Sequence, residues 1–303
     1  MGSRFLACDW GTTNLRAWVL GADGRVEAAR EFPLGVSKLQ PGEAARLFRE
    51  EVRPLMAAEG LPAVLCGMIG STLGWTVAPY LDCPINLEGL RRGLFRIAEP
   101  GPPVWIVPGL KGPGVAGAPE VMRGEETQVF GWLAEDPQRR RGVRLVCHPG
   151  THAKWIVARE GRIERFLSAM TGELFAVLTR HSVLKTEAPA EDEGAFLEGC
   201  AAAGDGSGLA TRLFTARTRI VAGDADPASA GAYLSGLLIG AEAASVPGLL
   251  GVAPGRPVAL VGEPALCRWY ALALERVGFQ VETYDGDEAV LDGLRALQPE
   301  TDG

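Results

Sequence analysis

The sequence predicts an α/β protein of two domains. Three observations support this: strand-like and helix-like segments alternate, 303 residues exceed the usual size of one hydrophobic core, and one strand–turn–strand plan occurs twice. We place the division between an N-terminal domain of residues 1–128 and a C-terminal domain of residues 129–303. Two domains of this kind offer a cleft in which a ligand can bind.

The N-terminal domain begins with apolar strands joined by small-residue turns. Residues 4–10 and 14–21 are predicted strands around a Gly-Thr turn, and residues 25–32 form a third strand after a Gly turn. Residues 41–60 have helical spacing, and Gly and Pro end this helix before an apolar strand at residues 63–70.

The rest of this domain holds one more strand and the helix at the domain junction. Residues 104–110 are a short buried strand. Residues 123–136 have helical spacing with acids in the first turn, where the helix dipole favours them. Residues 137–142 are basic and are predicted to form a loop.

The C-terminal domain repeats the beginning of the chain. Residues 144–166 have the plan of residues 4–32: an apolar strand ending in Cys, a Gly-Thr turn, a Trp-bearing strand, a Gly turn and a third strand. Aligning Gly11 with Gly150 superposes the two turns. We expect two related domains, each with one Gly-Thr turn; chance similarity between two hairpins is the alternative.

The end of the chain supplies the remaining elements of the second domain. Residues 256–262 form a buried strand, and residues 265–278 and 287–297 form helices. Residues 230–244 are a Gly/Ala-rich apolar helix that carries Glu242, which favours a buried helix of a soluble protein over a membrane span.

Composition excludes several classes of function. The net charge of −7 and the pI near 5.2 argue against general nucleic-acid binding, which needs a basic face. The six cysteines and three histidines are dispersed, so neither a zinc site nor a disulfide framework is expected. We expect a reduced, cytoplasmic protein with no nucleic-acid or membrane partner. The oligomeric state stays open, with a homodimer as a candidate.

The first Gly-Thr turn has the composition of a phosphate-binding loop. Gly11, Thr12 and Thr13 direct backbone N–H groups outward and add hydroxyl donors. Asp9, just before them, can hold a hydrated magnesium ion that bridges nucleotide phosphates. The alternative is a tight hairpin in which Asp9 caps backbone N–H groups.

Several longer motifs carry a resemblance to a known family. They are "DWGTTNLRAW", "CGMIGSTLGW", "APYLDCP", "MRGEETQ", "PGTHAKW", "MTGELFAVLTRHSVL", "LSGLLIGAE" and "LVGEPALCRWYALALERVG", in this order over nearly the whole chain. With them the chain resembles the 2-dehydro-3-deoxygalactonokinase family of the hexokinase/actin-like superfamily. The resemblance implies two ribonuclease-H-like domains with an interdomain ATP cleft. It also implies Mg²⁺-dependent transfer from ATP to the 6-hydroxyl of 2-dehydro-3-deoxy-D-galactonate (2-keto-3-deoxygalactonate) in galactonate catabolism.

The resemblance also implies roles for individual residues. Asp9 would be the magnesium-side acid, and His148 stands where the superfamily often has a second acid, so Asp9 alone would bind the metal. The phosphate-binding and adenosine-binding residues would be Gly11, Thr12, Thr13, Gly150, Thr151, Lys154 and Gly262.

Glu125 and Glu126 are the candidates for the general base. An acid at the start of the junction helix can accept the proton of an attacking hydroxyl. Glu126 is slightly favoured because it lies one residue further into the motif. The alternative is that both carboxylates only cap the helix.

The substrate's own carboxylate requires a cation. Arg16 and Arg123 are the candidates, because a planar guanidinium pairs bidentately with a carboxylate. Ser71 and Trp75 suit a sugar pocket, with a hydroxyl for hydrogen bonds and an aromatic ring for an apolar face. Each has an ordinary structural alternative, as a surface charge or a core side chain.

Two rival functions share this fold. One is a kinase for another sugar acid, a neutral sugar or a pantothenate-like hydroxyl. The other is a non-enzymatic, ATP-binding regulator; it is weaker, because the chain shows neither a helix-turn-helix pattern nor coiled-coil heptads.

Overall fold

The structure is a computed structural model that describes residues 3–187, 191–204 and 208–298. The chain divides into two compact units, neither continuous in sequence. The first comprises Met1–Val143, Ala158–Arg165 and Gly286–Gly303, and the second comprises Arg144–Val157 and Phe166–Asp285. The predicted boundary between residues 128 and 129 falls within helix α4 (Glu125–Glu135) and stays a prediction.

The first six-stranded sheet has the order β3-β2-β1-β4-β8-β7. β1 pairs antiparallel with β2 and parallel with β4, and β4 pairs parallel with β8. Nearly every residue of β1 is buried, as expected for a central strand covered on both faces. The strands are β1 (Phe5–Trp10), β2 (Leu15–Leu20), β3 (Val26–Phe32), β4 (Ala63–Gly67), β7 (Phe95–Ile97) and β8 (Val104–Ile106).

The second six-stranded sheet has the order β15-β14-β11-β12-β13-β6, with β14 parallel to both β11 and β15. Each sheet contains the three strands of the repeated plan side by side, with a later strand next to the first of them: β3-β2-β1-β4 in one sheet and β13-β12-β11-β14 in the other. The plan predicted to occur twice is therefore present in both sheets. The strands are β6 (Ile85–Asn86), β11 (Val143–His148), β12 (Ala153–Arg159), β13 (Arg162–Ala169), β14 (Pro257–Gly262) and β15 (Gln280–Asp285).

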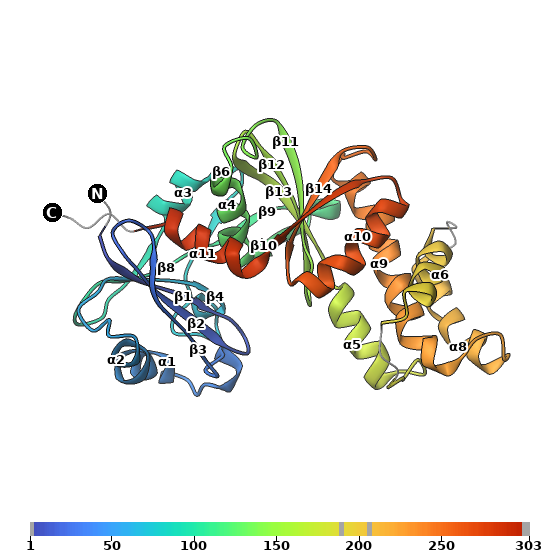
Figure 1. Cartoon of the computed structure of the whole chain (residues 1–303), viewed down its shortest axis with the longest axis horizontal. Helices are drawn as coiled ribbons and strands as arrows, with labels where there is room; N and C mark the ends of the chain where they lie inside the picture. The colour runs from blue at the N-terminus through green and yellow to red at the C-terminus, as the bar shows by residue number, and fades with distance from the viewer. Residues whose placement is uncertain (1–2, 188–190, 205–207, 299–303) are drawn as a thin grey trace. The chain divides into compact units, whose positions relative to one another are not determined.

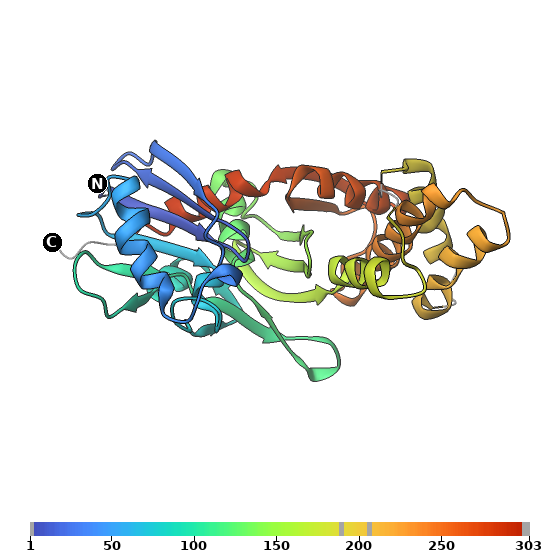
Figure 2. The same ribbon diagram turned by 90° about the horizontal axis from the view of Figure 1, so that it is seen from below.

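A third, small sheet has the order β10-β9-β5, from β5 (Tyr80–Asp82), β9 (Gly109–Pro113) and β10 (Pro119–Met122). Its β9–β10 hairpin protrudes in Figure 2. The predicted helix at residues 41–60 forms as three consecutive segments, α1 (Glu43–Leu47), a π-helix (Phe48–Val52) and α2 (Arg53–Leu55). Short 3₁₀ turns occur at Val36–Lys38, Met68–Gly70, Val115–Gly117 and Pro227–Ser229.

The remaining helices belong to both units. They are α3 (Leu87–Arg92), α4 (Glu125–Glu135), α5 (Thr171–His181), α6 (Glu193–Ala203), α7 (Leu209–Leu213), α8 (Thr215–Val221), α9 (Ala230–Leu249), α10 (Pro264–Arg276) and α11 (Gly286–Ala296).

Helix α4 is held against α11, and the two lie side by side in Figure 1. Both helices contribute a glycine to the contact. A Cβ on Gly131 would lie 1.9 Å from the carbonyl oxygen of Ala289, and one on Gly293 would lie 2.0 Å from that of Thr127. No larger residue fits at either position without moving the backbone, so this contact fixes the position of α4, whose first turn carries the two candidate glutamates.

Helix α9 is the apolar helix predicted at residues 230–244. It packs against α6 and α10 (Figure 1), and most of its residues are buried. In the described part of the chain, one stretch, Pro227–Leu249, is long and apolar enough to cross a membrane by length and composition alone. Its burial within the second unit fits the predicted core helix.

Candidate active site

The first Gly-Thr turn joins β1 to β2 and is anchored by its carbonyl groups. Gly11 N–H donates to Asn14 O at 3.0 Å, and the Thr12 and Thr13 carbonyls accept from Ser37 and Gly35 N–H at 3.1 Å. The side chains of Thr12 and Thr13 are exposed. The turn is thus fixed on its inner side and keeps its hydroxyl groups on the surface.

Asp9 is the last residue but one of β1, the strand in front of this turn. Its side chain is 16% exposed, and Arg16 Nη2 on β2 lies 2.6 Å from Asp9 Oδ2. Arg16 also pairs through Nη1 with Asp287 on α11. The positive charge between two carboxylates keeps Asp9 oriented at the end of the sheet.

Gly67 provides the space that the Asp9 carboxylate occupies. Its φ is +85°, and a Cβ there would lie 3.0 Å from Asp9 Oδ1 and 2.9 Å from Trp10 O. A Cβ on Gly124 would lie 3.4 Å from Gly67 Cα. Asp9 and the start of α4 therefore both approach Gly67 at the end of β4.

The first turn of α4 holds both candidate bases by their backbone. Gly124 N–H donates to Glu126 Oε2 at 2.8 Å, and Arg123 N–H donates to Glu125 Oε2 at 3.0 Å. Glu126 is fully buried, and Glu125 is half-buried. Thr127 Oγ1 lies 3.2 Å from Glu126 Oε1.

Burial raises the pKa of Glu126 to about 8, and the charge of Glu125 adds to this effect. Burial also raises the pKa of the Cys66 thiol, and the charges of Asp9 and Glu126 raise it further. Both carboxylates thus act on the end of β4. A carboxyl group with this pKa is suited to accept a proton near neutral pH.

Arg123 is buried beneath the loop that follows β4. Its Nη2 donates to Ala78 O at 2.8 Å, and its guanidinium lies 4.4 Å from the centre of the Tyr80 ring. Within the described structure, its buried Nε and Nη1 have no hydrogen-bond partner. These unsatisfied N–H groups leave the guanidinium able to donate to a further acceptor, such as a carboxylate oxygen.

The other predicted substrate residues lie in the same loop. Ser71 Oγ donates to Met68 O at 2.7 Å and accepts from Leu73 N–H at 3.2 Å. Trp75 is half-buried, with its ring centre 5.5 Å from that of Phe48. The structure brings Ser71 and Trp75 into the loop above Arg123, and both have structural contacts there.

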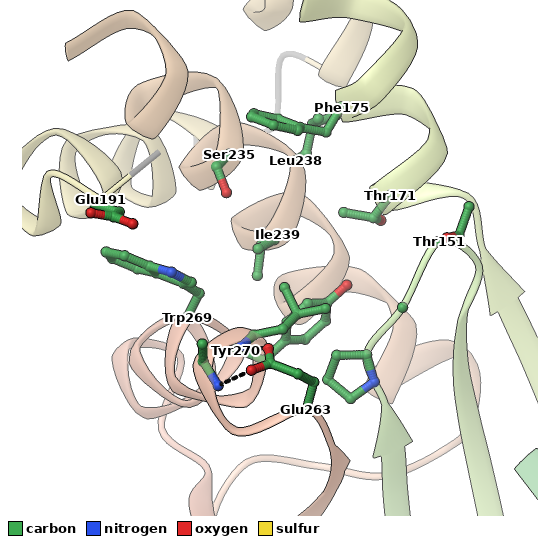
Figure 3. Close-up of a pocket in the computed structure, with 15 residues that line it drawn as sticks. Thr151, Thr171, Phe175, Glu191, Ser235, Leu238, Ile239, Glu263, Trp269 and Tyr270 are labelled. Carbon is green, nitrogen blue, oxygen red and sulfur yellow. Dashed lines mark hydrogen bonds between the residues drawn. The ribbon is translucent and has the colours of Figure 1, made fainter. Parts of the chain in front are cut away.

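The second Gly-Thr turn borders a cavity of about 640 Å³ in the second unit (Figure 3). Gly150 and Thr151 are on its wall. The start of α5 lies directly against them: a Cβ on Gly172 would be 2.5 Å from Gly150 O, and Glu173 N–H donates to Thr151 O at 3.0 Å. The turn and the first residues of α5 therefore form one wall.

The end of β14 forms another part of this cavity. Gly262 itself is not on the wall; the next residue, Glu263, is, and it accepts N–H bonds from Ala265 and Leu266 at the start of α10. Lys154 is buried on β12 and is not among the lining residues. The structure therefore places Gly150, Thr151 and Glu263 around one cavity.

Sequence reasoning missed most of the cavity wall. Thr171, Phe175, Ser235, Trp269 and Tyr270 line it, from α5, α9 and α10. The motifs "MTGELF" and "LCRWY" contain four of these residues. Both motifs support the family resemblance, but the sequence indicated no role for these four residues. Their arrangement depends on how three helices pack, which no local pattern reveals.

The candidate metal ligands in the described part of the chain are few. Among the described residues, no group of three or more His, Cys, Asp or Glu side chains could hold a metal ion. Asp9 supplies one carboxylate. This donor set fits Mg²⁺, which keeps several waters and binds through one or two carboxylates and substrate phosphates.

The family model described as 2-keto-3-deoxy-galactonokinase matches residues 9–297. The chain belongs to this family. A curated member from Escherichia coli (strain K12), named 2-dehydro-3-deoxygalactonokinase, is 36% identical over 98% of this chain and 98% of its own length.

Solved structures agree with the family and with the predicted fold. One from Sinorhizobium meliloti, with the provisional name 2-dehydro-3-deoxygalactonokinase, is 35% identical over 97% of both chains, with a TM-score of 0.86. One from Porphyromonas gingivalis, provisionally named an N-acetylglucosamine kinase, is 13% identical over 96% of this chain and 98% of its own, with a TM-score of 0.50. The second likeness shows the fold alone, that of the actin-like sugar kinases. The family's fold matches the predicted α/β architecture.

Proposed function

We propose that this chain transfers the γ-phosphate of ATP to the 6-hydroxyl of 2-keto-3-deoxygalactonate. Membership of the family supports the kinase activity and the sugar-acid substrate. The observation that carries the chemistry is that Asp9 and the start of α4, which holds Glu126, both approach the end of β4, where both charges raise the pKa of Cys66. One carboxylate is exposed enough to meet a cation, and the other has a raised pKa.

Glu126 is the proposed general base. It accepts the proton of the 6-hydroxyl as that oxygen attacks the γ-phosphate, and its pKa of about 8 matches this task. Glu125 is the second candidate, because its side chain is less buried. A backbone N–H group orients either carboxylate: that of Gly124 donates to Glu126, and that of Arg123 donates to Glu125.

Arg123 is the proposed partner of the substrate carboxylate, because its guanidinium keeps N–H groups without a hydrogen-bond partner among the described residues. Ser71 and Trp75 form the loop beside it, and their proposed role is to shape the sugar pocket. Arg16 already pairs with Asp9 and Asp287, so any contact of Arg16 with substrate would compete with these two carboxylates.

The cavity of the second unit is the proposed nucleotide site. Gly150 and Thr151 would contact phosphate, and Glu263, beside Gly262, would face the adenosine. Gly11, Thr12, Thr13 and Lys154 are the further phosphate contacts proposed. Asp9 would hold Mg²⁺, which when bound neutralises charge on the phosphates. We place this enzyme in the cytoplasm; its six cysteines are free thiols.

The test is an acceptor panel followed by product analysis. Purified protein with Mg²⁺ and ATP is given 2-keto-3-deoxygalactonate, its gluconate epimer, a neutral sugar and pantothenate, and ADP release is measured. We expect ADP release only with the keto-deoxy acids. In the NMR spectrum of the product, we expect ³¹P–¹H coupling to the C6 protons. Turnover with the neutral sugar or pantothenate alone, or a phosphate on another carbon, would contradict it.

A further inference from the structure

Glu242, on α9, is a buried carboxylate behind the cavity of the second unit. Its side chain is 5% exposed. Trp155 Nε1 donates to Oε1 at 2.5 Å, Tyr270 OH donates to Oε2 at 2.9 Å, and Thr171 Oγ1 also donates to Oε2. One carboxylate therefore joins β12, α10, α5 and α9.

Two of these three donors line the cavity. Thr171 and Tyr270 are both on its wall and are labelled in Figure 3, whereas Trp155 is not among the lining residues. Thr171 is the first residue of α5, and the next residue, Gly172, touches the Gly150–Thr151 turn. The position of Thr171 thus determines how α5 meets the phosphate turn.

A carboxylate at this position is not explained by packing. Burial of an ionised group is unfavourable unless hydrogen bonds compensate for the lost water, and an apolar side chain of similar size fills such a position at less cost. Burial raises the pKa of Glu242, while its three hydrogen bonds act in the opposite direction. The carboxylate does what an apolar residue cannot: it accepts from both hydroxyl groups and fixes them relative to each other.

We propose that Glu242 is a positioning residue of the nucleotide cavity, which holds Thr171 and Tyr270 in the arrangement that binds ATP. This inference rests on the proposed function, because it takes the cavity as the nucleotide site. Glu242 itself touches neither ATP nor the sugar acid. Its effect is therefore expected on the affinity for ATP and not on the affinity for the acceptor.

The principal variant is Glu242→Gln, which keeps the shape of the side chain. Its amide accepts through one oxygen only, so the bonds to Thr171 and Tyr270 must reverse direction. Both hydroxyl groups must then rearrange at the cavity wall, so we expect KM for ATP to rise about tenfold or more. KM for the sugar acid, at saturating ATP, is expected to stay within about twofold.

Tyr270→Phe and Thr171→Val test the same network if Glu242→Gln fails to fold, as thermal unfolding would show. Each removes one donor and is expected to raise KM for ATP alone. Trp155→Phe is the matched control: it removes a donor to the same carboxylate from outside the cavity, and KM for ATP should change less than about threefold. An unchanged KM for ATP in folded Glu242→Gln, or, if that variant does not fold, in both Tyr270→Phe and Thr171→Val, overturns the proposal, and so does an equal rise in Trp155→Phe.

Ser235→Trp separates failure of this inference from failure of the proposed nucleotide site. Ser235 lines the cavity and has no contact with Glu242 among the hydrogen bonds above, so an indole there fills the cavity. If Ser235→Trp abolishes ATP binding in calorimetry and Glu242→Gln does not weaken it, the cavity is the nucleotide site and the positioning role is wrong. If Ser235→Trp binds ATP like the wild type, the nucleotide site itself is wrong.

Discussion

Arg16 Nη2 lies 2.6 Å from Asp9 Oδ2, and the two residues face each other in the antiparallel register of β1 and β2. Arg16 also pairs with Asp287 on α11. A guanidinium paired with two carboxylates restricts the orientation of both carboxylate side chains. The structure therefore supplies Asp9 with a fixed orientation, which a residue that binds a metal–nucleotide complex requires.

Replacement of Asp9 by Asn should remove most of the activity without unfolding the protein. The amide keeps the size of the side chain but loses the charge that the proposed magnesium complex needs, so we expect kcat to fall at least about 100-fold. Steady-state assays and thermal unfolding measure the two effects. Asp287→Asn is the matched control, because it removes the other carboxylate beside Arg16; equal losses in both variants would assign the effect to Arg16 rather than to Asp9.

Glu126→Gln should lower kcat about 10²–10⁴-fold, as expected for loss of a general base, while Glu125→Gln lowers it less than about tenfold. The two variants change neighbouring residues in one helical turn in the same way, so each controls for the other. Single-turnover kinetics separate chemistry from product release. A large loss in Glu125→Gln only would assign the base to Glu125, and small losses in both would place the base elsewhere.

The raised pKa of Glu126 predicts a pH dependence of stability. The carboxyl binds its proton more tightly in the folded protein, with a pKa of about 8 against 4.5 when unfolded. The stabilisation is complete below pH 4.5, decreases as the pH rises from there to about 8, and is absent above, at about 1.4 kcal/mol per pKa unit. Urea unfolding between pH 5 and pH 9 should show that the wild type loses stability relative to Glu126→Gln as the pH rises. A difference in the free energy of unfolding that does not change with pH would refute the raised pKa of Glu126.

Arg123→Lys should raise KM for the sugar acid about tenfold or more and leave KM for ATP unchanged. Lysine keeps the charge, but it loses the planar pair of donors that suits a carboxylate. Arg30→Lys is the control, since Arg30 is exposed over the Phe32 ring. Equal effects on KM for both substrates, or none in a folded Arg123→Lys, would argue against a carboxylate contact.

Gly67→Ala should reduce both activity and stability more than Gly24→Ala does. Both glycines have positive φ, +85° and +79°, so both substitutions strain the backbone by about 1 kcal/mol or more. Only at Gly67 does the new methyl group meet Asp9 and Trp10; at Gly24 it meets open space. Kinetics and chemical denaturation compare the pair, and an equal loss in both would mean that the space beside Asp9 is not critical.

Much of the fold could be predicted from local patterns. The β1–β2–β3 hairpins and their repeat at β11–β12–β13 follow from apolar strands separated by Gly turns, and α9 follows from its continuous apolar composition. The short strands β5, β7, β9 and β10 gave no complete pattern, because they contain few residues and several are exposed. The helices between Glu193 and Val221 were not predicted, since their mixed composition has no clear apolar stripe.

Part of the candidate site could also be predicted from local sequence, and the rest depends on tertiary packing. Asp9, the glutamates and the Gly-Thr turns are predictable because each is adjacent in sequence to a recognisable strand or helix start. The contact of Arg16 with Asp287, the burial of Glu126 and the cavity wall of Thr171 and Tyr270 join segments distant in sequence. Only tertiary packing determines them.

The most direct test of the proposed kinase activity is the rate of ADP release by the wild-type protein with Mg²⁺-ATP, measured with and without 2-keto-3-deoxygalactonate. We expect saturable turnover that requires the sugar acid and produces one equivalent of its phosphate ester per ADP. ATP binding without any ADP release in the presence of the acid, or ADP release that does not depend on it, would refute this activity.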